Sequence, residues 1–500
     1  MKRLAKRIGA LVAACLMLVM SMPIEAQAAE IGYTYTYDYW GDVQYSPDAY
    51  EVAGKYTATE LGLEKKLSAP QGMFVYNDYI YICDTGNNRI LELERTGTTE
   101  IKLVREITEF KGDVEINTFL APTDIAVSED YMFIADRDNG RIVKLDKDLN
   151  YVMEFVKPTD ETFDQSINFL PSKIIIDTAE RVYCVAKNVN KGLIKYEADG
   201  SFSGFIGSTP VVYEFWNYIW KKFASKEQRA KMENFVPTEY DNLYVDKEGF
   251  IYTCTMNISE KDLWDKKLDP IRRLNLMGSD ILIRNGNQDI IGDVNWGNGG
   301  GYNGPSLMVD VTAFDNESYV ALDRTRGRLF AYDDQGRLLF AFGGGGNMEG
   351  YFKTPSALEH MGYDLLVLDQ VDCSITLFTP TEYGNLVYQA MDLFQDGEYE
   401  ASGECWQKLI DLNGNYDLAY IGVGRSLLRQ ERYEEAMDYF ELKWDAENYS
   451  KAFQYYRKDW VEENIVAIVA ALIVVIVLPL SIGKIRKIKF EIDTADIFRR

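Results

Sequence analysis

The sequence predicts a mainly β protein: a six-bladed β-propeller, followed by a helical region and one transmembrane helix. Three observations support this fold class: a repeat of about fifty residues between 67 and 380, a helical periodicity after residue 382, and an uncharged apolar run near the C-terminus. A chain of 500 residues is too long for one hydrophobic core, so two or more folded units are expected.

The repeat is a short pattern: a proline, an apolar run, an aspartate, a polar turn, and a basic residue before an aliphatic one. Its clearest copies span 69–93, 121–145 and 354–378. Three more divergent copies begin at Pro171, Pro237 and Pro305. Each copy contains two or three alternating apolar segments separated by turns, which is typical of antiparallel strands. One copy is too short for its own core but has the length of a four-stranded blade, so residues 29–382 are predicted to form six blades in a closed ring.

The segment 31–58 precedes the first copy of the repeat and alternates tyrosine with polar residues. Alternation with a period of two is typical of a strand with one buried face. We expect this segment to supply the strand that completes the last blade and closes the ring.

The N-terminus is typical of a secreted or membrane-inserted protein. Residues 1–28 are predicted to be a signal peptide, because basic residues precede an apolar run and a small-residue cleavage site ends at Ala28. A lipoprotein-like tetrad ending at Cys15 leaves open whether this segment is cleaved, lipidated or retained.

The C-terminus contains a predicted membrane span. Residues 465–483 carry no charge and are long enough to cross the hydrocarbon core of a bilayer. The tail, 484–500, begins with four basic side chains, which predicts a cytoplasmic location by the positive-inside rule. The protein is therefore predicted to cross the cell membrane once, with the bulk of the chain extracytoplasmic.

The composition argues against one class of partner. The net formal charge is −25 at pH 7, and most of the acidic residues lie in the predicted extracytoplasmic part. Such a surface repels phosphate backbones, so no nucleic-acid binding is expected. The cysteines that follow the signal segment lack the spacing of a disulfide framework and are expected to be buried thiols.

The region 383–460 has the apolar periodicity of helices. Its two halves, 386–419 and 420–453, match at a period of thirty-four, with Trp406 equivalent to Phe440. The region resembles the tetratricopeptide helix pair, which implies two antiparallel pairs of helices. Two pairs are few for a free-standing solenoid, so we expect them to pack against the propeller or a partner.

The propeller repeats resemble the NHL-repeat family, in which the blade aspartate and an Arg-Ile or Arg-Leu pair recur at this spacing. The resemblance covers about residues 67–380 and departs from the pattern at Ala186, Thr255 and Ser374. The whole layout is similar to bacterial membrane-anchored NHL proteins that accompany carbohydrate ABC-transporter components. VPTEYDNLYVDKEGFIY and YIGVGRSLLRQERYEEAMDYF are among the segments that carry this similarity. It implies a binding or scaffold protein, an accessory of such a transporter, with a glycan or protein partner.

Seven residues recur at the aspartate and arginine positions of the repeat. A carboxylate at the end of a strand can accept N–H groups of the following turn, and an arginine can pair with a neighbouring carboxylate. Because they recur in unit after unit, these residues are expected to stabilise each unit and not to catalyse. They are Asp84, Arg89, Asp136, Arg141, Asp323, Arg328 and Asp369.

Departures from the repeat are the expected place for a ligand, because loops on a rigid scaffold usually carry binding groups. Three insertions stand out: a predicted helix at 213–235, the segment 262–269, and a glycine-rich loop at 284–306. Aromatic faces beside Asn and Asp suit sugar rings, although the same side chains could form an apolar lid. The ligand-binding candidates are Trp216, Tyr218, Trp220, Trp264, Trp296 and Tyr302.

The enzymatic alternative is a membrane-anchored, metal-dependent lactonase or lyase, since propellers of that type hold a metal in the central channel. Channel-facing positions carry mixed residues here, so no catalytic residue, metal ligand or cofactor is assigned. The one histidine, His360, is interpreted as a partly exposed loop residue, and no G-x-S-x-G motif is present. Three or more carboxyl or amide groups converging on the channel would favour the enzyme, whereas an apolar or plugged channel would favour a binding protein.

Overall fold

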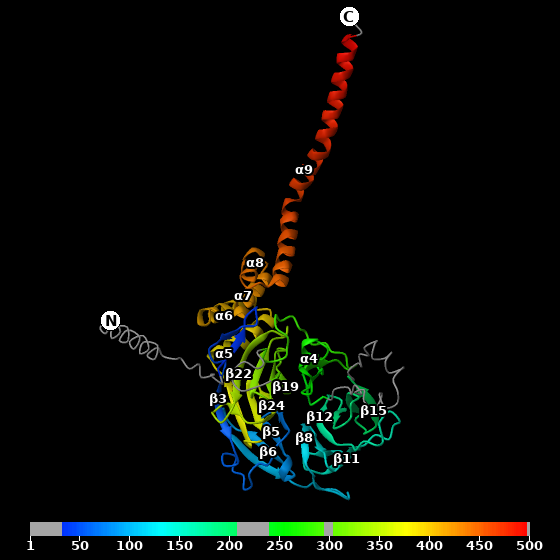
Figure 1. The fold of residues 1–500 in the computed structure, drawn as a ribbon, viewed down its shortest axis with the longest axis vertical. Coiled ribbons are helices and arrows are strands. Elements are labelled where there is room, and N and C mark those ends of the chain that lie inside the picture. The colour runs from blue at the N-terminus through cyan, green and yellow to red at the C-terminus, as the bar shows by residue number, and fades with distance from the viewer. Residues whose placement is uncertain (1–32, 208–239, 295–303, 498–500) are drawn as a thin grey trace, which may run out of the picture. The chain divides into compact units, whose positions relative to one another are not determined.

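The computed structural model describes residues 33–207, 240–294 and 304–497. The chain divides into two compact units, Met1–Gly384 and Asn385–Arg500. The first is mainly β and the second is helical (Figure 1). The predicted signal peptide and the predicted helical insertion lie outside the described residues.

The first unit consists of antiparallel sheets built largely from strands that follow one another in sequence. In the described part of the chain, five sheets have at least four strands and one has three. The first sheet contains β4 (Met73–Tyr76), β5 (Tyr79–Asp84), β6 (Arg89–Arg95) and β7 (Ile101–Ile107). The second contains β8 (Pro122–Val127), β9 (Tyr131–Asp136), β10 (Arg141–Asp146) and β11 (Tyr151–Val156). The third contains β12 (Pro171–Ile176), β13 (Val182–Ala186), β14 (Leu193–Tyr196) and β15 (Phe202–Ile206).

The remaining sheets include the three-stranded one and two that take strands from the N-terminal segment. The three-stranded sheet contains β16 (Asn242–Val245), β17 (Ile251–Cys254) and β18 (Ile271–Leu274). The next contains β19 (Met308–Ala313), β20 (Tyr319–Asp323), β21 (Arg328–Tyr332), β22 (Leu338–Gly345), β23 (Tyr351–Phe352), β1 (Tyr35–Tyr37) and β2 (Val43–Tyr45). The last contains β24 (Pro355–Met361), β25 (Asp364–Asp369), β26 (Ser374–Pro380) and β3 (Tyr50–Tyr56).

The N-terminal segment contributes to two sheets. β3 pairs antiparallel with β26 along its whole length and completes the last sheet. β1 pairs with β22 through Tyr35 and Ala341 and forms a hairpin with β2. A segment expected to supply one closing strand therefore supplies three strands, and it ties the start of the propeller to its last two sheets.

The first strands of the six sheets contact one another in a closed cycle. β4 contacts β8, β8 contacts β12, β12 contacts β16, β16 contacts β19, β19 contacts β24, and β24 contacts β4. This arrangement is a β-propeller, in which the ring of sheets leaves only short, protected edges.

A repeated bulge helps to join neighbouring sheets. The pairing of the first strand with the second skips one residue, Thr123 in β8 and Ser356 in β24, each directly after the repeat proline. Thr123 Oγ1 donates to the carbonyl oxygen of Pro171 at 3.1 Å, and Ser356 Oγ donates to that of Pro70 at 3.3 Å. Because the bulged residue is released from its own ladder, its hydroxyl can bond to the next sheet.

Apolar side chains pack between neighbouring sheets and form the core. Ile82 and Leu91 of the first sheet, for example, share a buried cluster with Leu366 and Leu368 of the last. Similar clusters join the first sheet to the second, the second to the third, the third to the fourth and the fourth to the fifth. Both faces of a sheet are therefore buried, which explains why the repeat contains apolar runs in addition to alternating segments.

The helical unit contains five helices in the described residues. α5 (Glu382–Gln395) begins at the boundary between the units and is followed by α6 (Tyr399–Leu412), α7 (Asp417–Arg429), α8 (Tyr433–Leu442) and α9 (Ala446–Ile497). The connections before α6 and α8 contain residues with positive φ, Gly397 at 87° and Glu431 at 64°. Such a conformation ends a helix and lets the chain turn back.

Two glycines of α7 allow its neighbours to pack closely. A Cβ atom on Gly424 would lie 2.6 Å from Phe440 Cε1 of α8, and one on Gly422 would overlap the indole of Trp406 of α6. Trp406 and Phe440, the two residues matched by the thirty-four-residue period, are both buried. The equivalent aromatic residues therefore both pack on the intervening helix.

Substitution Gly422→Ala should destabilise the helical unit by about 1–3 kcal/mol, because the new methyl group overlaps a buried indole that cannot move freely. The measurement is urea unfolding followed by tryptophan fluorescence. Gly403→Ala in α6 is the matched control: its methyl would lie 3.4 Å from Ser426 Cβ, so helix propensity should dominate and stabilise by about 0.5–1 kcal/mol. Equal effects of the two substitutions would contradict this account of the packing.

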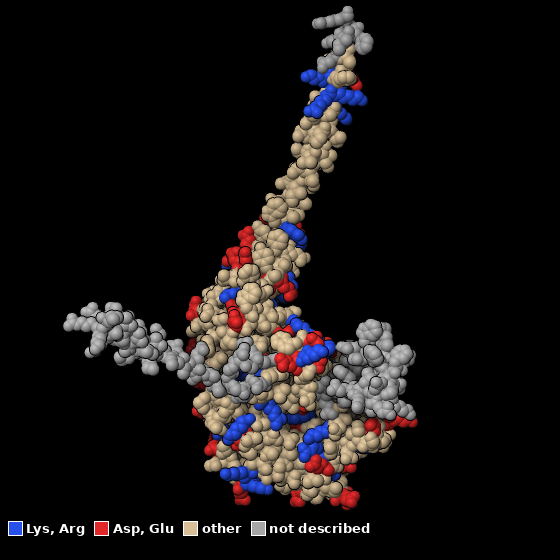
Figure 2. Space-filling view, in the orientation of Figure 1, with Lys and Arg blue, Asp and Glu red and all other residues tan. Residues whose placement is uncertain are grey.

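One helix in the described part of the chain, within Ala446–Ile492 of α9, is long and apolar enough to cross a membrane. Its apolar stretch is exposed throughout. Figure 2 shows this stretch without charged side chains and a group of basic side chains beyond it. The basic residues are Lys484, Arg486, Lys487 and Lys489. A long exposed apolar helix of this composition suggests a membrane anchor.

Candidate functional site

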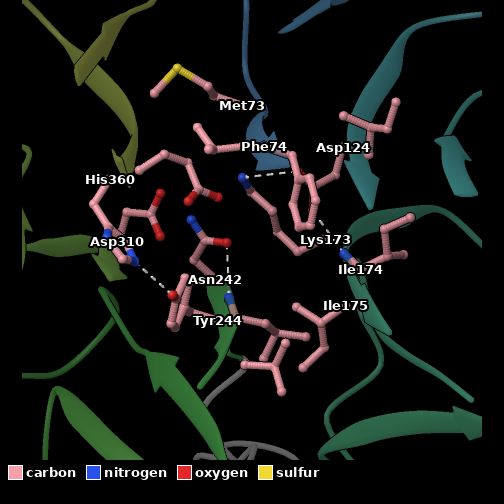
Figure 3. A pocket seen from close by; sticks show the side chains of 15 residues that line it. Met73, Phe74, Asp124, Lys173, Ile174, Ile175, Asn242, Tyr244, Asp310 and His360 are labelled. Atoms are coloured by element: carbon pink, nitrogen blue, oxygen red, sulfur yellow. Dashed lines mark hydrogen bonds and ion pairs between the residues drawn. The ribbon is translucent and has the colours of Figure 1, made fainter. Parts of the chain in front are cut away.

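The propeller contains a cavity of about 210 Å³ lined by residues from the first strands of all six sheets (Figure 3). Its polar lining is Asp124, Lys173, Asn242, Tyr244, Asp310, Glu359 and His360. Its apolar lining is Met73, Phe74, Val75, Ile125, Ile174, Ile175, Leu243 and Val245. Figure 3 shows Lys173, Asn242 and Asp310 reaching into the same space from different strands. The cavity combines an apolar wall with a few converging polar groups, which is the usual composition of a small-molecule site.

One position of the repeat supplies most of this polarity. Strand pairing places Asp124, Lys173, Asn242, Asp310 and Ala357 at equivalent positions of five sheets, opposite Ala135, Val185, Cys254, Leu322 and Leu368. Gly72 is the equivalent in the first sheet, since its carbonyl accepts from the N–H of Cys83. The backbone repeats at this position while the side chain changes, so the chemistry of the cavity differs from strand to strand.

Asp124 and Lys173 form an ion pair in the cavity wall. Lys173 Nζ lies 3.6 Å from Asp124 Oδ1, and Asp124 Oδ2 accepts the N–H of Ile174 at 2.9 Å. Burial favours the neutral form of both side chains. It raises the pKa of Asp124, whereas for Lys173 the charges of Asp124 and Asp310 outweigh burial and raise the pKa. Lys173 therefore stays an ammonium.

Asp310 and Glu359 are the two other acids of the cavity. Asp310 accepts the N–H groups of Val311 at 2.8 Å and Leu358 at 2.7 Å. Burial raises the pKa of Asp310 to about 7. It raises the pKa of Glu359 well above its usual value, with the charges of Asp310 and Asp124 adding to the effect. Near neutral pH, Asp310 is therefore close to its midpoint, and burial favours the protonated form of Glu359.

His360 lies in β24 and lines the cavity, so its interpretation as a loop residue was wrong. Its Nδ1 lies 3.0 Å from the carbonyl oxygen of Gly362, and its Nε2 lies 3.0 Å from Tyr244 Oη. A carbonyl oxygen can only accept, so Nδ1 carries a proton. Burial lowers the pKa of His360, which favours a neutral ring. The Tyr244 hydroxyl has one proton and two acceptors within reach, His360 Nε2 and the carbonyl oxygen of Ala313 at 3.1 Å. The contact between Tyr244 and His360 links β16 to β24 (Figure 3).

Of the aromatic ligand-binding candidates, the structure describes Trp264. It lies at the end of α4 (Glu260–Trp264), in the insertion between β17 and β18, and is 55% exposed. The other five candidates fall in residues 208–239 and 295–303, outside the described residues. Trp264 is not among the residues that line the cavity.

The repeat aspartates of the first two sheets have the same hydrogen bonds. Asp84 accepts the N–H of Ser68 at 2.7 Å, the side chain of Asn87 at 2.8 Å and Arg89 Nε at 2.7 Å. Asp136 accepts the equivalent groups of Leu120, Asn139 and Arg141 at 2.7, 2.8 and 3.0 Å. Both aspartates are completely buried. We propose that each joins the end of its strand to the chain that enters its sheet.

The later repeat positions vary this pattern. Asp323 accepts the N–H of Leu307 at 3.0 Å, and Asp369 accepts that of Lys353 at 2.6 Å. Arg328 does not reach Asp323; its Nη1 lies 2.6 Å from Asp293 Oδ2 and donates to the Tyr35 hydroxyl. This arginine therefore ties an insertion and the N-terminal strand to its sheet.

The cavity residues were missed by sequence reasoning. Asp124 and Lys173 each stand two residues after a repeat proline, at a place where the pattern otherwise reads as a buried strand. A charged residue in a strand that is buried on both faces needs a partner or a polar space. A charged residue in a buried strand was therefore the available signal, but these positions were interpreted only as a mixture of residues.

The grouping of the polar side chains limits the chemistry. Across residues 33–207, 240–294 and 304–497, no set of three or more His, Cys, Asp or Glu side chains is close enough to hold a metal ion. The cavity instead offers three carboxyl groups, one amide and one ammonium group around a partly apolar space. Such a set can bind a small ligand by charge and hydrogen bonds, or exchange protons with it.

Comparisons with known proteins support the fold. The LVIVD repeat, a β-propeller repeat, matches residues 122–143, which lie in the second sheet. The match is not to NHL repeats, so that subfamily is not confirmed. A comparison with curated protein sequences finds no match.

Solved propeller structures are similar to the first unit at low identity. A streptogramin B lyase is 13% identical, with a TM-score of 0.39, and the match covers 67% of this chain and 100% of the lyase. The virginiamycin B lyase of Staphylococcus aureus is 10% identical, with a TM-score of 0.38 and coverage of 66% and 99%. An auxiliary nutrient binding protein of Bacteroides thetaiotaomicron is 10% identical, with a TM-score of 0.39 and coverage of 70% and 77%. At these scores the similarities carry no argument about function.

Proposed function

We propose that this protein is an extracytoplasmic, membrane-tethered binding protein whose propeller takes a small polar ligand in its central cavity. The observation that carries the proposal is the cavity itself, where Asp124, Lys173 and Asp310 come together from three sheets beside an apolar wall. Buried charges of this kind cost stability in a purely structural core, so their presence around an open space supports a binding role.

The proposed topology places the propeller outside the cell. The predicted signal peptide, 1–28, directs the chain across the membrane, and α9 anchors it in the cell membrane. The basic residues after the apolar run of α9 keep the tail, 484–500, in the cytoplasm.

The proposed architecture is a six-bladed propeller with a helical partner-binding region. In this proposal β16–β18 is the fourth blade, supported by the contacts of β16 with β12 and β19. Helices α5–α8 are proposed to be tetratricopeptide-like pairs that bind a protein partner. The resemblance to membrane-anchored NHL proteins makes a carbohydrate ABC-transporter component the first candidate for that partner, and a glycan the first class of ligand for the aromatic insertions.

The second candidate function is a propeller-type lactonase or lyase. Three carboxyl groups and one amide line the cavity, which is the arrangement expected to favour an enzyme. The same side chains do not group as metal ligands in the described part of the chain, so the metal-dependent form of this alternative has less support than binding. Turnover of an added lactone that disappears in an Asp310→Asn variant would favour the enzyme.

The tether is tested by truncation. A chain ending at Asp445 lacks α9 and should move from the membrane pellet to the soluble fraction, whereas a chain ending at Lys489 keeps the apolar run and should stay in the pellet. Recovery of the shorter chain in alkali-washed membranes would count against α9 as the anchor.

Partner capture tests the binding role. Cross-linking of the full-length protein in membranes, followed by mass spectrometry, should recover a component of a transport system. Protease added to intact spheroplasts should degrade the propeller. A protected propeller would place the unit on the wrong side of the membrane and overturn the proposal.

A further inference from the structure

Acidic groups outnumber basic ones in the lining of the central cavity. Asp124, Asp310 and Glu359 contribute three carboxyl groups, and Lys173 contributes the one ammonium group of the lining. Lys173 is paired with Asp124. Among the ion pairs of the described residues, none includes Asp310 or Glu359. Asp310 and Glu359 therefore face the cavity outside any ion pair of the described residues, and the charge of Lys173 acts on them from a longer distance.

These two carboxyl groups are neighbours. They lie on the adjacent strands β19 and β24, and Asp310 Oδ2 accepts the N–H of Leu358, the residue directly before Glu359. The charge of Asp310 contributes to the raised pKa of Glu359, as expected for two acids that share a desolvated site. In the absence of a cation, such a pair lowers its free energy by keeping a proton.

The remaining lining residues suit the part of a ligand that lies away from the two carboxyl groups. Ile125, Ile174 and Ile175 of β8 and β12 form part of an apolar wall, and Asn242 offers an amide. An engineered apolar cavity of about 150 Å³ in another protein binds benzene, so a cavity of about 210 Å³ has room for one six-membered ring. A compact ligand with a hydrocarbon body and one polar end fits this composition.

We propose, on the basis of the binding function proposed above, that the cavity binds a small organic ammonium compound of about the size of one ring. Its ammonium group lies at Asp310 and Glu359, and its hydrocarbon body contacts the isoleucines of β8 and β12. The ligand supplies the positive charge that the lining lacks.

Binding of this cation is coupled to proton release. An aliphatic ammonium keeps its proton across the neutral range, since amines of the lysine type have a pKa near 10.4. When the ammonium group enters, the carboxyl groups release a proton to water. The negative charge that this release leaves on them balances the positive charge of the ligand. The titrating groups that face the site are Asp124, Lys173, Tyr244 and His360. Of these, Lys173 stays charged, and neutral His360 is held by Gly362 and Tyr244.

The test uses the full-length protein in detergent, with cyclohexylamine as the probe and cyclohexanol as its neutral counterpart of the same ring size. Calorimetry should show cyclohexylamine binding at least about tenfold more tightly than cyclohexanol, which corresponds to one charge-assisted contact. Its affinity should rise by about fivefold to tenfold between about pH 6 and about pH 8, because fewer protons must be released.

Variants locate the site. Glu359 is in no ion pair of the described residues, so Glu359→Gln breaks none. This variant should reduce the preference for the ammonium probe over cyclohexanol to within about threefold, and Asp310→Asn should do the same. Asp315→Asn is the control, because that side chain is 89% exposed and outside the cavity; it should leave both affinities unchanged.

The outcomes separate this inference from the proposed function. If cyclohexanol binds as tightly as cyclohexylamine, the ligand is neutral and the inference fails while the binding function stands. If neither probe binds at millimolar concentration but the membrane partner is still captured, the cavity is not the ligand site and the inference fails as well. Loss of partner capture and of protease accessibility would instead overturn the proposed function.

Discussion

Substitution Lys173→Met should destabilise the propeller by about 3–5 kcal/mol near pH 8, the loss typical of breaking a buried ion pair from one side. Lys173 is the one ammonium group among three carboxyl groups of the cavity, and its side chain is 12% exposed. Without it, Asp124 loses its partner and every carboxyl group of the cavity loses the positive charge that lowers its pKa. The measurement is urea unfolding followed by circular dichroism.

The same substitution should cost less at about pH 5, because Asp310, with a pKa of about 7, is then protonated and needs no counter-charge. Lys102→Met is the control: that lysine is 59% exposed, pairs with the exposed Glu100, and should change the free energy of unfolding by less than about 0.5 kcal/mol. An equal loss at both pH values would show that Lys173 acts through packing and not through charge.

The stability of the wild-type propeller should contain a component that falls as the pH rises from about 5 to about 8. Burial raises the pKa of Asp310 to about 7 and that of Glu359 well above its usual value. An acid with a raised folded-state pKa binds more protons in the folded state than in the unfolded state. Its contribution is fully present below the unfolded pKa, near 4, and is lost as the pH rises through the folded pKa.

Other groups contribute with the opposite sign, so the prediction concerns a difference between two proteins. Lys353 and Lys55 lower the pKa of Asp372 to about 2, which adds stability that is lost only in strong acid. Burial lowers the pKa of His360, which makes stability rise with pH below the usual histidine value. Both groups remain in an Asp310→Asn/Glu359→Gln double variant. Unfolding titrations should therefore show the wild type gaining stability over this variant as the pH falls from about 8 to about 5. Parallel curves would contradict the raised pKa values.

The mainly β propeller and the apolar C-terminal helix could be predicted because their signals are local. In four of the sheets the sequence runs from a proline to an aspartate through apolar and alternating residues, and the turn residues mark the hairpins. The apolar run in α9 is likewise continuous in sequence. Period and composition are sufficient for features of this kind, because neighbouring residues determine them.

The cavity could not be predicted in the same way because its contacts are long-range. Asp310 bonds to Leu358 of the next sheet, and His360 bonds to Tyr244 across more than one hundred residues. When neighbouring sheets bury both faces of a strand, the alternation of its residues does not indicate which of them reach the centre of the propeller.

The repeat arginines show a further limit of prediction from the sequence. Arg89 and Arg141 pair with the aspartate of their own sheet, whereas Arg328 pairs with Asp293 from an insertion. The three arginines look equivalent in sequence. An insertion that supplies a competing carboxylate can redirect one of them, and the repeat pattern contains no information about that competitor.

The most direct test of the central claim, that the cavity holds two buried carboxyl groups outside any ion pair of the described residues, is infrared difference spectroscopy of the full-length protein across pH. The wild type should show a protonated carboxyl band that persists to about pH 7, and this band should be absent from the Asp310→Asn/Glu359→Gln double variant. Complete ionisation of all carboxyl groups by about pH 5, or an unchanged band in the variant, would contradict the account.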